Sequence, residues 1–190
     1  MRSKTILVLA MLCLAGSVSA QQRKMILDSN TAFYEGENLR YIIPAPSGFK
    51  LVTDEAFKDG YSLAFIAKGE QYDSASVIIG VNIYKTRGMK FDSILVQDTL
   101  SIRKHYGRNL KIRSVDPLHA QTGDVLRTYY LEEGKQFIPN QVIAYFNGGT
   151  EMVIFELVSS PEVLKFKAEK LFTDCVHSFQ PLKRGTLGQR

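Results

Sequence analysis

Asp116 and His119 are the pair of side chains whose types and spacing best suit proton transfer. They stand on either side of Pro117 and Leu118. Imidazole titrates near neutral pH, and a neighbouring carboxylate can orient it as a general base. A hydrolase also needs a nucleophile, and no G-x-S-x-G or S-x-x-K motif supplies one. Because catalytic groups assemble in space from distant parts of a sequence, a hydrolase site at Asp116 and His119 stays open as a hypothesis.

The other histidines and the acidic residues show no metal-binding pattern. His105 and His177 fall at the C-terminal ends of two predicted helices, where a histidine can interact with free carbonyl groups. The sequence contains no H-E-x-x-H, no C-x-x-C and no calcium loop. Its glycines do not follow a strand and open a helix, as phosphate-binding loops require. We therefore expect a non-enzymatic chain without catalytic, metal-binding or cofactor-binding residues.

Residues 1–20 have the pattern of a cleaved signal peptide. Arg2 and Lys4 precede an apolar run of about ten residues, and Val18-Ser19-Ala20 supplies small side chains for cleavage before Gln21. The run is short for a hydrocarbon layer of about 30 Å, which argues against a signal anchor. The sequence has no second long apolar segment, so we expect no transmembrane segment in the mature chain. A lipoprotein would need a cysteine in the place of Gln21. The predicted location is periplasmic or secreted.

The mature chain is close to neutral and has one cysteine. The full sequence has 24 Lys and Arg against 19 Asp and Glu. Two basic side chains lie in the leader and three in residues 183–190, which leaves 19 of each sign between them. A neutral body lacks the clustered positive charge that nucleic acid binding requires. Cys13 leaves with the leader, so Cys175 has no disulfide partner in the chain and is expected to be buried on the last helix.

Hydrophobic periodicity predicts the elements that position these residues. Residues 21–38 form an irregular lead-in, residues 39–182 form one globular domain, and residues 183–190 form a polar basic tail. Helices are expected at 92–106 and from Pro161 to about Ser178. Strands are expected at 39–44, 62–67, 76–84, 110–119, 124–132, 137–146 and 151–159.

The last four predicted strands are joined by short turns and should form an antiparallel meander. Residues 152–158 are almost continuously apolar, which is typical of a central strand covered on both faces. In the first predicted helix, Val96 and Leu100 fall off the main apolar stripe, which predicts burial on a second side. The expected fold class is α+β, an antiparallel sheet of six or seven strands with helices packed on it.

The order of these elements resembles the PsbP/DcrB-like family of exported accessory domains, which includes the Mog-type proteins. The resemblance starts at Tyr41-Ile42-Ile43-Pro44-Ala45-Pro46-Ser47-Gly48-Phe49, which is similar to that family's F-x-x-x-P-x-x-W/F opening. Phe49 stands where the family often has an indole. The resemblance continues through residues 76–84, the helix beginning Phe91-Asp92-Ser93 and the helix ending Val176-His177-Ser178-Phe179, and so covers about residues 39–182. It implies an α/β/α sandwich and an accessory or partner-binding role without shared catalytic residues.

Three hypotheses of function follow from these patterns. The favoured one is a non-enzymatic exported accessory or protein-binding domain that docks a protein partner in the cell envelope. A specialised version of it is a periplasmic immunity protein that neutralises a toxin. The second hypothesis is a carrier of a small apolar ligand in a groove between helix and sheet, since pairs such as Tyr129 and Tyr130 place one ring on each face of a strand. The third is the hydrolase with Asp116 and His119.

Overall fold

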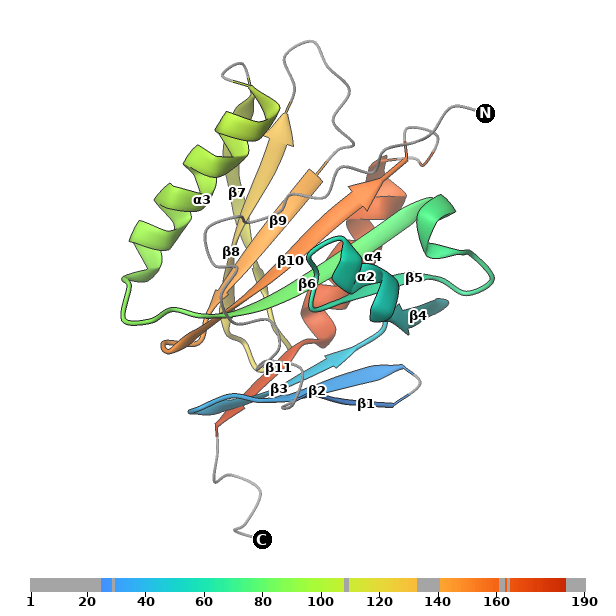
Figure 1. Cartoon of the computed structure of the whole chain (residues 1–190), viewed down its shortest axis with the longest axis horizontal. Coiled ribbons are helices and arrows are strands. Elements are labelled where there is room, and N and C mark those ends of the chain that lie inside the picture. The colour runs from blue at the N-terminus through green and yellow to red at the C-terminus, as the bar shows by residue number, and fades with distance from the viewer. Residues whose placement is uncertain are drawn as a thin grey trace, which may run out of the picture.

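The computed structural model describes residues 25–28, 30–107, 110–132, 141–160, 163 and 165–183. The predicted leader at 1–20, the predicted helix start at Pro161 and residues 184–190 of the predicted tail lie outside the described residues. Within the described part, the strands form two antiparallel sheets, one of seven strands and one of four (Figure 1).

The larger sheet has the strand order β4-β5-β6-β10-β9-β8-β7. This arrangement confirms the predicted α+β class, the seven-stranded antiparallel sheet and the meander of the last four predicted strands. β10 is the middle strand and is buried on both faces, as its apolar run predicts. The bounds are β4 (Phe49–Val52), β5 (Leu63–Ala67), β6 (Val77–Lys85), β7 (Lys111–His119), β8 (Val125–Glu132), β9 (Gln141–Asn147) and β10 (Glu151–Ser159).

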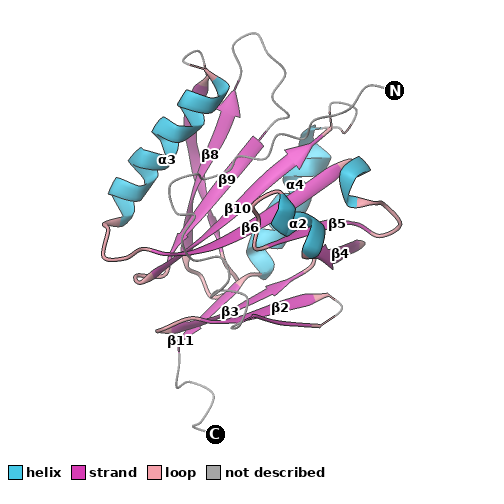
Figure 2. Ribbon diagram, in the orientation of Figure 1, coloured by secondary structure: helices cyan, strands magenta, loops and turns pink. Residues whose placement is uncertain are grey.

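Helices cover both faces of this sheet (Figure 2). α3 (Phe91–Tyr106) packs on β8, β9 and β10, while α2 (Asp54–Lys58) and the short 3-10 helix η2 (Tyr72–Ser74) lie over β5 and β6 on the same face. α4 (Lys165–Ser178) lies on the opposite face, behind the sheet in Figure 1. No helix in the described ranges is long and apolar enough to cross a membrane.

A second sheet, with the order β1-β2-β3-β11, joins the two ends of the described chain. Its strands are β1 (Met25–Leu27), β2 (Thr31–Glu35), β3 (Leu39–Pro44) and β11 (Gln180–Lys183). It covers the α4 face of the large sheet, because alternate side chains of β2 and β3 enter the same core as α4. The layer on the α4 face therefore consists of α4 and the four-stranded sheet, whereas the expected α/β/α sandwich had helices alone in that layer.

The arrangement adds to or differs from the sequence expectations in four places. Residues 31–35 of the expected lead-in form the strand β2 and bury Ala32 and Tyr34. Val96 and Leu100 are each 59% exposed, because only one side of α3 faces the sheet. The strands β4 and β11 and the helix α2 were not predicted; each has four or five residues, too few to show a clear period. The missing amide donors of Pro44 and Pro46 predict a place for residues 39–44 at a sheet edge or sheet end. β3 instead lies between β2 and β11, and Pro44 is tolerated because it ends the strand.

Candidate binding groove between α4 and the meander

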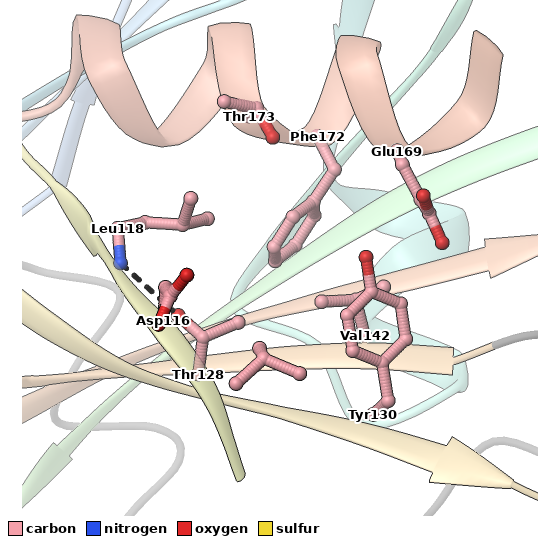
Figure 3. A pocket seen from close by; sticks show the side chains of 9 residues that line it. Asp116, Leu118, Thr128, Tyr130, Val142, Glu169, Phe172 and Thr173 are labelled. Atoms are coloured by element: carbon pink, nitrogen blue, oxygen red, sulfur yellow. Dashed lines mark hydrogen bonds between the residues drawn. The ribbon is translucent and has the colours of Figure 1, made fainter. Parts of the chain in front are cut away.

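A groove of about 210 Å³ lies between α4 and the strands β7, β8 and β9 (Figure 3). It lies between a helix and the sheet, where the ligand-carrier hypothesis expected one. Apolar, hydroxyl and acidic side chains share its lining, which consists of Val115, Asp116, Leu118, Thr128, Tyr130, Val142, Glu169, Phe172 and Thr173.

The floor of the groove belongs to the main core. Phe172 of α4 and Val142 of β9 are buried and pack in the same cluster as the centre of the large sheet. Buried aromatic and branched side chains in such a cluster have little freedom to move. The floor is therefore a fixed apolar surface.

A β-bulge in β7 shapes one wall. β7 is an edge strand, and its register with β8 shifts between Val115 and Leu118. The backbone amide of Leu118 donates to Oγ1 of Thr128 at 3.4 Å, drawn as the dashed line in Figure 3. Pro117 lies in the same irregular stretch, where an edge strand tolerates a missing donor. The bulge places Asp116 on the rim of the groove.

The opposite rim is acidic and hydroxylated. The Tyr130 hydroxyl of β8 and the Glu169 carboxylate of α4 lie next to each other in Figure 3. Burial raises the pKa of Tyr130 to about 12, and the hydrogen bond and negative charge of Glu169 add to that rise. The Arg113 guanidinium lies over the Tyr130 ring, 5.4 Å from its centroid, and acts on that pKa in the opposite direction. Tyr130 is thus a neutral hydroxyl at physiological pH.

The structure separates the two residues of the hydrolase hypothesis. Asp116 lines the groove, whereas the exposed His119 does not line it. Nδ1 of His119 lies 3.5 Å from the carbonyl oxygen of Gly123, in the turn that follows β7. The nine lining residues include no His, Cys, Lys or Ser. The groove therefore offers an apolar floor and fixed polar groups, which suit binding.

The remaining predicted positions take structural or surface places. Cys175 is a free thiol and fully buried, as expected, and burial raises its pKa well above the usual range. His105 and His177 are exposed in the last turns of α3 and α4. In the described ranges, no group of three or more His, Cys, Asp or Glu side chains could hold a metal ion.

Sequence reasoning missed three buried carboxylates, Asp98, Glu151 and Glu156. The signal was present, since Asp98 interrupts the apolar stripe of a predicted helix and Glu156 interrupts the most apolar predicted strand. Glu151 lies on the α4 face, where its two oxygens accept hydrogen bonds from the hydroxyls of Tyr34 and Tyr41, each at 3.3 Å.

Glu151 has no room for a ligand beside it. A Cβ atom on Gly36 would lie 1.9 Å from Oε2 of Glu151, and one on Gly148 would lie 2.3 Å from the Tyr41 hydroxyl oxygen. Both glycines are therefore required by close packing around this carboxylate. Glu151 ties the small sheet to the large one and is not a binding site.

Comparison with known proteins finds a likeness of structure but none of sequence. No family model matches the chain, and no curated protein matches it. Among solved structures, the chain is similar to cyanobacterial PsbP (CyanoP) from Synechocystis sp. PCC 6803, with 12% sequence identity and a TM-score of 0.49. The match covers 82% of this chain and 95% of the cyanobacterial one. The fold class rests on the strand order of the chain itself, and no residue role is transferred from this neighbour.

Proposed function

We propose that this chain is an exported, non-enzymatic accessory domain whose groove between α4 and β7–β9 docks a protein partner. The observation that supports the proposal is the size of the groove together with its fixed apolar floor. Protein interfaces commonly gain their affinity where one anchoring side chain enters a preformed pocket. The partner in this proposal places one such side chain against Phe172 and Val142.

The volume favours a protein partner over a carried ligand. Small-molecule sites usually occupy about 300–1,000 Å³ and bury most of the ligand surface. The groove is smaller, at about 210 Å³. It has room for one side chain of a partner, whose remaining contacts would lie on the rim.

The rim chemistry is that of an interface border. Asp116, Tyr130 and Thr173 bring polar groups around an apolar centre, the usual distribution in protein interfaces. The lining contains no imidazole or thiol, and its polar groups are carboxyl groups and hydroxyls. The non-enzymatic role is part of the proposal.

Site-specific photo-crosslinking in the native host tests the proposal. A photoreactive amino acid at Asp116 should give a discrete protein adduct, and the same group at Lys104 on the α3 face should not. The substitution Thr173→Trp fills the groove from α4 and should abolish the Asp116 adduct. Circular dichroism checks that this variant keeps its fold, which is expected because Thr173 is only partly buried.

Three results would contradict protein docking at this groove. One is an equal adduct from Lys104 and Asp116, and another is an Asp116 adduct that Thr173→Trp leaves unchanged. The third is a non-protein mass retained by the purified protein in native mass spectrometry and displaced by Thr173→Trp. That third result would favour the carrier of a small ligand.

A further inference from the structure

Two acidic side chains are buried on the face of the large sheet that carries α3, opposite the groove. Asp98 of α3 is 5% exposed, and Glu156 of β10 is 6% exposed. Charged carboxylates are rarely this buried unless a cation compensates them. Among the described residues, the groups that act on these two carboxylates are each other and tyrosine hydroxyls.

Asp98 has one oxygen with a donor and one without. The hydroxyl of Tyr145 on β9 donates to Oδ2, while Oδ1 is buried and has no hydrogen-bond partner. An ionised carboxylate would leave negative charge on an oxygen that no donor stabilises. This environment favours the protonated, uncharged form of Asp98 over the carboxylate.

Glu156 stands beside Asp98 on the same face of the sheet. Its Oε2 accepts a hydrogen bond from the Tyr61 hydroxyl at 3.0 Å. Tyr61 lies against Gly80, the residue paired with Glu156 across β6, where a Cβ atom would come within 2.3 Å of the ring. The Glu156 carboxyl group on β10 is thus enclosed by the Tyr61 ring, which packs over the neighbouring strand β6.

The titratable groups around this pair come from every neighbouring element. They are Tyr106 on α3, Tyr84 on β6, Tyr129 on β8, Tyr145 on β9, and Tyr61 and Tyr72 beyond α2. Burial raises the pKa of Tyr61, Tyr84 and Tyr145 above its usual value, so these three hydroxyls are neutral. Arg127 on β8 pairs instead with the exposed Asp92 at the start of α3. Tyrosine hydroxyls donate to a carboxylate without neutralising it, so protons must balance the charge.

Both connections of α3 contain left-handed backbone. Arg87 has φ 51° and Gly88 has φ 78° before the helix, and Gly107 has φ 96° after it. Hinges are commonly a few loop residues that absorb changes of φ and ψ. The outer side of α3 is exposed, so the helix is held to the sheet by a single side.

We propose that α3 is a pH-dependent element that docks on the sheet while Asp98 and Glu156 carry protons and loosens when they lose them. Burial raises the pKa of Glu156 from 4.5 to about 7, the nearby Asp98 charge adds to the rise, and the Tyr61 hydrogen bond opposes it. Burial also raises the pKa of Asp98, against the effect of the Tyr145 hydrogen bond.

The direction of the effect follows from proton linkage. In the loosened state water reaches Glu156, which then titrates near its ordinary pKa of 4.5. The docked state therefore binds the proton more tightly, and raising the pH favours loosening. For Glu156 alone the ratio of loosened to docked α3 rises about tenfold per pH unit between 4.5 and 7, about 300-fold in all, and then levels off. Because burial also raises the pKa of Asp98, loss of its proton makes the ratio of loosened to docked α3 rise more steeply with pH.

Amide hydrogen exchange of the intact protein tests the proposal by comparing α3 with α4 between pH 4.5 and 8.5. After correction for intrinsic exchange rates, protection of α3 relative to α4 should fall by at least about 300-fold up to pH 7 and then level off. The double variant Asp98→Asn and Glu156→Gln should lose this response. Asp92→Asn, an exposed change on the same helix, should keep it.

Several outcomes would overturn the proposal. In the first, the protection of α3 and that of α4 change equally with pH. In the second, the double variant responds to pH as the wild-type protein does. In the third, Asp92→Asn loses the response. If the double variant does not fold, the carboxyl carbon of Glu156 is titrated by NMR in the wild-type protein. A midpoint near pH 7 supports the proposal, and a midpoint near 4.5 overturns it.

Discussion

At the scale of single residues, the carboxylate of Glu151 connects the two sheets. It is 1% exposed and lies at the first position of β10, while its two donors, Tyr34 and Tyr41, come from β2 and β3. A buried carboxylate that loses a donor keeps its desolvation cost without compensation. The two tyrosine hydroxyls are therefore more important to stability than their long hydrogen bonds suggest.

Replacement of either tyrosine by phenylalanine should destabilise the protein. Tyr34→Phe and Tyr41→Phe each remove one donor to Glu151 and should lower the free energy of unfolding by about 1–3 kcal/mol. Urea denaturation of each single variant and of the double variant measures this. The double variant should differ from the sum of the singles, because both hydroxyls serve one carboxylate.

Tyr129→Phe is the control for this pair. Tyr129 is only partly buried, and its ring packs edge-on against Tyr145. Loss of its hydroxyl should change the unfolding free energy by less than about 0.5 kcal/mol. Equal losses in Tyr129→Phe and Tyr41→Phe would show that the carboxylate does not link the sheets.

At the scale of elements, the junction between α4 and β11 closes the core on the groove side. Phe179 is fully buried between the two elements. Its ring lies 6.0 Å from Tyr41, 5.3 Å from Phe146 and 5.2 Å from Phe155, measured between centroids. One side chain thus joins the small sheet to the middle of the large one.

Phe179→Ala should cost about 3–5 kcal/mol of unfolding free energy, because it leaves a cavity among three aromatic rings. Phe166→Ala is the matched control, since Phe166 is a phenylalanine of α4 that is 64% exposed. That control should change stability by less than about 0.5 kcal/mol. Thermal or urea unfolding checks both. Similar losses in the two variants would contradict the packing described for Phe179.

Elements with a long and regular hydrophobic period were predictable, and those stabilised by distant partners were not. β6 places Val77, Ile79, Val81 and Ile83 on one face, and all four enter the main core as predicted. β2 and β11 are short, with the sequences TAFYE and QPLK, and neither is long enough to show a clear period. They are strands because β3 pairs with both, and that pairing is not visible in local sequence.

The candidate groove was predictable in part. Its location between a helix and the sheet was expected, and so was the placement of Tyr129 and Tyr130 on opposite faces. The side chains that form it come from β7, β8, β9 and α4, and their approach depends on the bulge in β7. A shift of register by one residue has no clear sequence signature, so the position of Asp116 on the rim needed the structure.

At the scale of the whole molecule, the large sheet separates two regions with different chemistry. The groove lies on the α4 face, and the carboxylates Asp98 and Glu156 lie on the α3 face. Substitutions at distant sites without shared partners usually act independently. Variants in the groove and variants under α3 should therefore separate partner docking from the response to pH.

Export is the prediction that concerns the chain as a whole. Expressed in a bacterial host, the protein should appear outside the cytoplasm with Gln21 as its first residue, which N-terminal sequencing or intact mass measurement shows. Ala20→Arg should block cleavage, because it removes the small side chain next to the cut. Ser19→Leu changes the position between the two small residues and should leave cleavage intact. Cytoplasmic protein that begins with residue 1 would contradict export.

The pairing of β3 with β11 also limits the order in which the molecule can fold. Lys183 pairs with Leu39, so two strands from opposite ends of the described chain must meet before the small sheet is complete. A growing chain releases its N-terminal part first and cannot make this contact until β11 has been synthesised. Until then, Tyr34 and Tyr41 lie in an incomplete sheet. Pairing of β11 with β3 completes the small sheet and holds β2 and β3 in place.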